Sequence, residues 1–98
     1  MAIIATAISE LSRNIVRYAR AGEITLQSSN QNAVPGIIVI ASDNGCGIAD
    51  VGEVMKDGYS TSGGLGLGLP GVRRLMDEFE IASRPGRGTT VTVKKWRR

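Results

Sequence analysis

A glutamate and an asparagine near the start of the chain have the residue types and the spacing that phosphate chemistry needs. Glu10 and Asn14 are four residues apart, which on a helix places both side chains on the same side, away from the apolar stripe. A carboxylate can orient or deprotonate an attacking hydroxyl or water, and an amide oxygen can complete the oxygen shell of Mg²⁺. Arg17, one turn later, is placed to reach a phosphate. Alone, this spacing decides little, because such pairs on helix faces are usually just solvated.

A second polar group follows an apolar run and contains Asp43, Gly45 and Gly47. A carboxylate at the end of a buried strand is costly unless a donor meets it. The exocyclic amine of adenine is such a donor, and the two glycines would let a flat ring approach the backbone closely. A tight turn that begins with aspartate explains the same residues equally well.

A glycine-rich run, Gly63 to Gly68 (GGLGLG), comes directly before an apolar helix pattern. Free N–H groups at a helix N-terminus, together with the positive end of the helix dipole, form a natural seat for phosphates. The run is not a Walker loop, because no Gly-Lys-Ser/Thr ends it, and its glycines do not have the Rossmann order. A flexible loop is the alternative interpretation. Further on, Thr89 follows a glycine and could hold a water against adenine, although threonine is common in strands anyway.

The elements that must position these residues follow from the hydrophobic pattern. Apolar residues spaced by three and four predict a helix over Ile3–Ala21. Alternation predicts a strand over Glu23–Ser28, turn residues fill Ser29–Gly36, and the β-branched run Ile37–Ala41 predicts a strand buried on both faces. The short connection favours an antiparallel hairpin.

The second half of the chain adds a helix and two strands. Apolar spacing from Leu69 to Phe79 predicts a helix, with Pro70 in its first turn. The remaining expected segments are a short helix over Asp50–Met55, a long loop over Asp57–Gly68, a strand over Ile81–Arg84, a turn over Pro85–Gly88 and a final strand over Thr89–Lys95. Together they predict an α+β fold, a two-layer α/β sandwich whose mostly antiparallel sheet is covered by helices on one face.

Composition excludes several classes of function. The chain has 98 residues, enough for one domain, and no histidine, so a serine–histidine triad and histidine metal sites are absent. Its single cysteine cannot form an internal disulfide, which is typical of a cytoplasmic protein. No apolar run reaches the length of about 20 residues that spans a bilayer. With a net charge of +3 and four aromatic residues in the chain, we expect no nucleic-acid partner.

The order of the motifs resembles one ATPase superfamily. Glu-x-x-x-Asn on a helix, Asp-x-Gly-x-Gly after a strand, a glycine-rich run entering a helix, and Gly-Thr at a strand resemble the N, G1, G2 and G3 boxes of the GHKL (Bergerat-fold) superfamily, which includes gyrase, Hsp90, histidine kinases and MutL. The resemblance implies binding of ATP with Mg²⁺. It also implies a Bergerat-type sandwich, with residues 1–98 forming a single GHKL ATP-binding kinase domain.

A longer stretch, from Asp57 to Thr89, together with Ile8 to Ile15, is similar to the small serine-protein kinases of bacterial stress signalling, the RsbT type found in stressosomes. This similarity implies Asn14 as Mg²⁺ ligand, Glu10 as base and Asp43 as the adenine-recognising residue. The other residues implied to bind the nucleotide are Arg17, Gly45, Gly47, Gly64, Gly66, Leu67, Gly68 and Thr89. The implied partners are STAS-domain substrates and a PP2C-type phosphatase, with no membrane.

Two further expectations follow from the resemblance. Family members begin with a strand and a helix before the Glu-x-x-x-Asn helix, whereas this chain starts within that helix, so an N-terminally truncated domain is implied. An uncovered sheet edge would then favour an oligomer. Two related functions stay open beside the serine/threonine kinase: an anti-sigma factor kinase that sequesters a sigma factor, and a nucleotide-gated binding switch without kinase activity.

Overall fold

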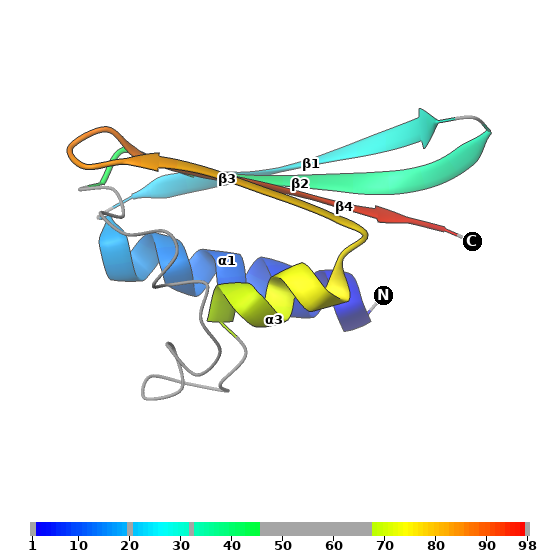
Figure 1. The fold of residues 1–98 in the computed structure, drawn as a ribbon, viewed down its shortest axis with the longest axis horizontal. Coiled ribbons are helices and arrows are strands. Elements are labelled where there is room, and N and C mark those ends of the chain that lie inside the picture. The colour runs from blue at the N-terminus through cyan, green and yellow to red at the C-terminus, as the bar shows by residue number, and fades with distance from the viewer. Residues whose placement is uncertain (1, 20, 32, 46–67, 98) are drawn as a thin grey trace.

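The described residues form one antiparallel sheet with helices on one side. The computed structural model describes residues 2–19, 21–31, 33–45 and 68–97. The sheet has the strand order β1-β2-β4-β3, and α1 and α3 both lie beneath it (Figure 1). The predicted two-layer α+β fold is therefore confirmed. The elements are α1 (Ala2–Tyr18), β1 (Gly22–Gln31), β2 (Val34–Asp43), α3 (Gly68–Leu75), β3 (Glu78–Arg84) and β4 (Gly88–Trp96).

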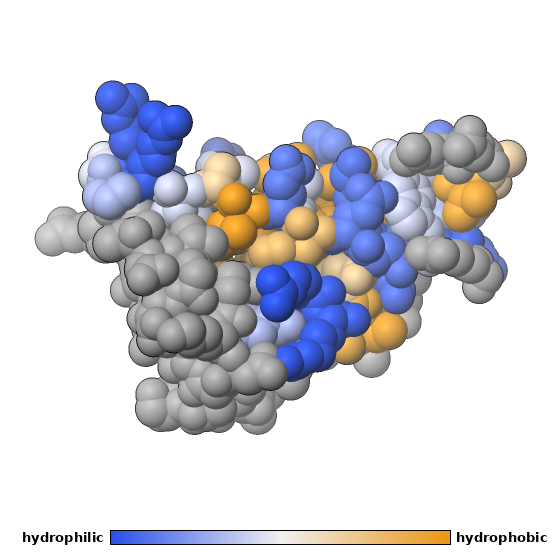
Figure 2. Space-filling view, viewed as in Figure 1, coloured by the Kyte–Doolittle hydropathy of each residue, from blue (hydrophilic) through white to orange (hydrophobic). Residues whose placement is uncertain are grey.

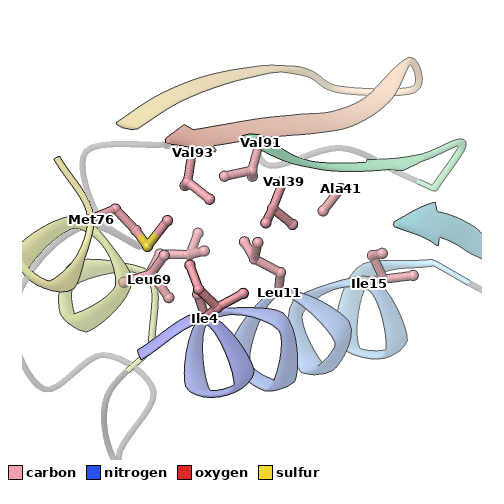
Figure 3. Packing of buried hydrophobic residues seen from close by; sticks show 11 residues of the cluster. Ile4, Leu11, Ile15, Val39, Ala41, Leu69, Met76, Val91 and Val93 are labelled. Atoms are coloured by element: carbon pink, nitrogen blue, oxygen red, sulfur yellow. The ribbon is translucent and has the colours of Figure 1, made fainter. Parts of the chain in front are cut away.

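The core lies between the helices and the sheet. Leu11 is fully buried, and Ile4 and Ile15 are nearly so, because spacings of four and seven residues return to one face of a helix. These side chains meet those of the sheet and of α3 (Figure 3). Each such burial contributes about 1.5–3 kcal/mol. The apolar stripe was predicted correctly, but α1 ends at Tyr18 rather than at Ala21.

The hairpin between β1 and β2 is longer than predicted. The ladder runs from the pair Gly22 and Asp43 to the pair Gln31 and Val34, so the predicted turn over Ser29–Gly36 is wrong. Only two residues separate the strands, and one of them, Ala33, has a φ of 64°. Cross-strand pairing therefore overrides the turn preference of the Asn, Pro and Gly residues in this stretch.

Helix α3 is shorter than predicted, and Phe79 lies in β3 instead. After Leu75 the N–H of Asp77 donates to the carbonyl of Lys94 in β4 (2.9 Å), which directs the chain into the sheet. Alternate residues of β3 then face the helices, starting with Phe79. The apolar spacing matched a helix because Phe79 contributes to the same core from a strand.

The outer face of the sheet is less buried than predicted. In β2, Val39 and Ala41 face the helices and are buried, whereas Ile38 and Ile40 on the other face are only half-buried, so the expectation of burial on both faces is wrong. The side view shows apolar surface below β3 between hydrophilic side chains, and a hydrophilic projection at the β3–β4 hairpin (Figure 2).

The predicted helix over Asp50–Met55 lies outside the described residues.

Candidate functional site

Glu10 lies in α1 and joins the two helices. Its carboxylate is only 6% exposed. The backbone N–H of Gly68, at the start of α3, donates to Oε1 (3.2 Å), and the Arg13 guanidinium donates to Oε2 (2.9 Å). The alternative interpretation of Glu10 as a solvated surface residue is thus wrong, because the start of α3 contacts its carboxylate.

Asn14 lies one turn after Glu10 and is half-buried. Gly22 of β1 lies against both Ile15, the neighbour of Asn14, and Asp43 at the end of β2. A Cβ atom added to Gly22 would be 2.8 Å from Cγ2 of Ile15 and 3.0 Å from Cβ of Asp43, so Ile15 is close to the end of β2. This places Asn14 at the same end of the molecule as Asp43. Arg17 is also in α1, but its side chain lies outside the described part of the structure.

Asp43 is the last residue of β2 and is only 6% exposed. The N–H of Gly45 donates to its Oδ1 (2.9 Å), which is the hydrogen bond of an aspartate turn. Within the described residues, Oδ1 alone has a bonded donor, so Oδ2 can accept from a ligand. The turn and the ligand interpretations of Asp43 are therefore compatible.

A row of polar side chains crosses the sheet beside Asp43. Asp43 pairs with Thr89 of β4, and Thr89 pairs with Ser83 of β3. Thr89 is 3% exposed, and its hydroxyl lies 2.7 Å from that of Ser83. All three side chains are on the face toward the helices, because they alternate with outward-facing neighbours.

A glycine fixes how closely β4 approaches Asp43. Gly88 has a φ of +88°, and a Cβ there would lie 2.1 Å from the carbonyl oxygen of Asp43. Only glycine tolerates both this conformation and this contact. The Gly-Thr pair thus brings the Thr89 side chain next to Asp43.

The glycine-rich run is described only at its end. Gly68 has a φ of 59° and begins α3 with its N–H directed at the Glu10 carboxylate, and the N–H groups of a first helical turn suit an anion. Gly47, Gly64, Gly66 and Leu67 lie outside the described residues. Among the residues described, no cluster of three acidic or cysteine side chains forms a metal site. An amide ligand such as Asn14 fits Mg²⁺ bound together with phosphates, because Mg²⁺ takes few protein ligands there.

Two residues of this region were missed in the sequence. Arg13 lies three residues after Glu10, a spacing at which helix side chains meet, and this signal was available. Ser83 lies two residues before the hairpin turn, and periodicity alone does not decide which residue of β4 it faces. Only the register of β3 on β4 brings the two together.

Comparison with known proteins identifies the family. Residues 2–98 match the family described as histidine kinase-, DNA gyrase B-, and HSP90-like ATPase. The chain belongs to this family. It is 54% identical over 95 residues to the serine/threonine-protein kinase RsbT of Bacillus subtilis (strain 168), covering 97% of this chain and 71% of that protein.

Related proteins with a different name also match. The anti-sigma F factor of Caldanaerobacter subterraneus subsp. tengcongensis is 34% identical over 102 residues, covering 98% of this chain and 70% of that protein. That of Thermoanaerobacter sp. (strain X514) is 32% identical over the same length. The similarity to RsbT places this chain among the kinases of the ATPase family. No described helix is long and apolar enough to cross a membrane.

Proposed function

We propose that this chain is an Mg²⁺- and ATP-dependent protein serine/threonine kinase. Its substrates would be STAS-domain proteins of a bacterial partner-switching stress pathway in the cytoplasm, such as a stressosome, with a PP2C-type phosphatase that reverses the reaction. The similarity to RsbT supports the reaction class. The observation that carries the proposal is the buried Glu10 carboxylate, held at the first N–H of the helix that follows the glycine-rich run.

The proposed roles follow from the chemistry of each group. Mg²⁺ bound through the amide oxygen of Asn14 would neutralise charge on the ATP phosphates. The substrate hydroxyl oxygen attacks the γ-phosphorus, the bond to the bridging oxygen of ADP breaks, and Glu10 takes the hydroxyl proton. Glu10 keeps lone pairs for this step, since each of its oxygens accepts one hydrogen bond from Arg13 or Gly68.

The base end and the phosphate end of the nucleotide would lie on different elements. We place adenine at Asp43 and Thr89, with Gly45 and Gly47 close to the ring. We place the phosphates along Gly64, Gly66, Leu67 and Gly68, with Arg17 reaching them from α1. Support comes from Asp43 and Thr89, which are adjacent in the sheet and buried on the helix side, and from the position of Gly68 at the start of α3.

The decisive experiment uses γ-labelled ATP, Mg²⁺ and candidate STAS-domain proteins. We expect label on a serine or threonine of the partner, and about 10²-fold less label or lower still when Glu10→Gln replaces the wild type. The matched control is Glu80→Gln, which alters an exposed carboxylate of β3 and should leave transfer unchanged. Intact ATP binding without transfer to any partner would contradict the kinase and favour the nucleotide-gated switch.

A second candidate is an anti-sigma factor kinase, because anti-sigma F factors are among the relatives. Such a protein would sequester a sigma factor in addition to its kinase activity. Affinity capture with the purified chain separates the two: a sigma factor that binds in the presence of Mg²⁺-ATP favours this candidate, whereas exclusive capture of an STAS protein favours the first.

We also infer that the chain can associate through a sheet edge. Strand β1 is an outer strand of the sheet, and its Leu26 is 53% exposed. A long edge strand offers unpaired backbone groups to another copy. Light scattering over a range of protein concentrations tests this: a mass that stays at that of one chain would contradict it.

A further inference from the structure

The Ser83 hydroxyl lies beside the proposed base-recognition residues Asp43 and Thr89. Ser83 faces the helix side of β3 and stands opposite Thr89 in the register. Its Oγ lies 2.7 Å from Thr89 Oγ1 and 3.2 Å from the carbonyl oxygen of Gly88. Both distances allow O–H···O hydrogen bonds. Ser83 therefore contacts the backbone of the hairpin and the Thr89 side chain at the same time.

The chemistry of the two partners sets the direction of the hydrogen bonds when both contacts form at once. A carbonyl oxygen only accepts, whereas a hydroxyl has one proton to donate. Both contacts are hydrogen bonds at once only if Ser83 donates to Gly88 and Thr89 donates to Ser83. In this arrangement the Thr89 proton points away from Asp43, so Thr89 offers only lone pairs on its other side.

Asp43 has the same hydrogen-bonding character. Its carboxylate is an acceptor and already takes the Gly45 N–H on Oδ1. Thr89 is the direct partner of Asp43 across β2 and β4, where side chains on one face lie roughly 5 Å apart. Two buried acceptors side by side recognise a donor, such as the 6-amino group of a purine or a water bound to it, and disfavour a carbonyl at that place.

We propose that Ser83 is a positioning residue for nucleobase specificity: it holds the Thr89 hydroxyl as an acceptor beside Asp43 and so favours a 6-amino over a 6-oxo purine. This inference rests on the proposed nucleotide site, but not on phosphoryl transfer. Without the Ser83 hydroxyl, Thr89 can rotate its proton toward the ligand and accommodate either group. Ser83 thus acts through Thr89 and needs no contact of its own with the nucleotide.

The test compares the affinities for ATP and for inosine triphosphate, which carries a 6-oxo group, by isothermal titration calorimetry. We expect the wild type to prefer ATP. Ser83→Ala should lower the ratio of the two affinities by about fivefold, since one neutral hydrogen bond is worth about 1 kcal/mol. Ser83→Thr keeps the hydroxyl and should therefore keep the affinity ratio of the wild type. If Ser83→Ala is too unstable to measure, Ser83→Cys gives the same comparison with a weak donor of similar size.

The matched control is Ser42→Ala. Ser42 forms the same kind of cross-strand hydroxyl pair, with Thr90 at 3.2 Å, but on the outer face of the sheet, and its loss should leave the ratio unchanged. Equal weakening of both nucleotides by Ser83→Ala would show a purely structural role and overturn the inference, as would an unchanged ratio. A changed ratio without any phosphoryl transfer would support the role of Ser83 and contradict the kinase proposal. A wild type that binds no ATP would contradict both proposals.

Discussion

The cost of burying a carboxylate explains how the Glu10 side chain is held. A buried ionised group must replace its lost hydration by hydrogen bonds. Glu10 does so with one charged donor, Arg13, and one backbone donor, Gly68. Because each oxygen accepts a single bond from these donors, the carboxylate is held in place and can still accept a proton. A fixed orientation of this kind is what general-base catalysis requires.

At the same scale, Asn14 should couple nucleotide binding to Mg²⁺. Asn14→Ala removes the proposed amide ligand, so we expect ATP affinity in Mg²⁺ to fall at least about tenfold and phosphoryl transfer to fall with it. Asn14→Asp keeps an oxygen ligand and should retain part of the affinity. Equilibrium titration with and without chelator measures this effect. Normal phosphorylation by Asn14→Ala would show that the metal assignment is wrong.

The sequence predicted the place of a residue where local spacing was sufficient, but not where a contact with a distant residue decides its surroundings. The position of Glu10 in a helix followed from local spacing, but its burial by α3 depends on a contact between residues 58 apart. No periodicity within one helix shows which neighbour covers its polar side. The same holds for Ser83, whose partner is set by strand register. Asp43 was easier, since the end of a strand is visible in the sequence.

At the scale of elements, a hydrogen bond from the Gly68 N–H to the Glu10 carboxylate connects α3 to α1. Glu10→Ala would leave the Gly68 N–H without its acceptor, and we expect a loss of about 1–3 kcal/mol in the free energy of unfolding. Glu10→Gln keeps an acceptor oxygen and should lose less stability, yet it cannot take a proton, so transfer should fall by about 10²-fold or more. Urea unfolding and the transfer assay give the two quantities. Equal free energies of unfolding for Glu10→Ala and Glu10→Gln would show that this hydrogen bond does not stabilise the fold.

The β3–β4 hairpin offers a matched pair of glycines. Gly88→Ala combines a positive φ with a Cβ only 2.1 Å from the Asp43 carbonyl oxygen, so we expect it to cost more than about 3 kcal/mol or to prevent folding. Gly86→Ala has a similar φ of +77° but no atom within 4 Å of its Cβ, and should cost about 1–2 kcal/mol. Thermal unfolding compares them. Similar losses would mean that the close approach to Asp43 contributes nothing.

Element types were more predictable than element lengths. Turn-forming residues such as Asn30 and Pro35 suggested a long connection, yet they pair with each other across β1 and β2. Phe79 fits a helical spacing after Leu75 but serves the core from a strand. In both places tertiary contacts outweigh local preference, which is why the fold class was predicted correctly and the boundaries were not.

In the described part of the molecule, the core lies between the helices and the sheet, and the buried polar residues Asp43 and Thr89 lie at one end of the sheet. Buried apolar side chains of α1, α3 and the sheet fill the layer between them (Figure 3). Asp43 and Thr89 lie where β2 ends and β4 begins, beside the part of α1 that contains Ile15. A nucleotide bound there and at the start of α3 would contact both layers, and its binding energy would add to the stability of the native state.

Nucleotide binding should therefore raise the unfolding temperature of the entire domain. At a ligand concentration of about 100 times Kd the stabilisation is about 2.7 kcal/mol, which for a domain of this size corresponds to a shift on the order of ten degrees. Differential scanning calorimetry with Mg²⁺-ATP measures it, and chelation of Mg²⁺ should remove most of the shift. Val93→Ala serves as the control: it removes buried core atoms and lowers the starting temperature, while the ligand-induced gain in free energy should remain. A shift of equal size without Mg²⁺ would mean that the metal contributes nothing to nucleotide affinity.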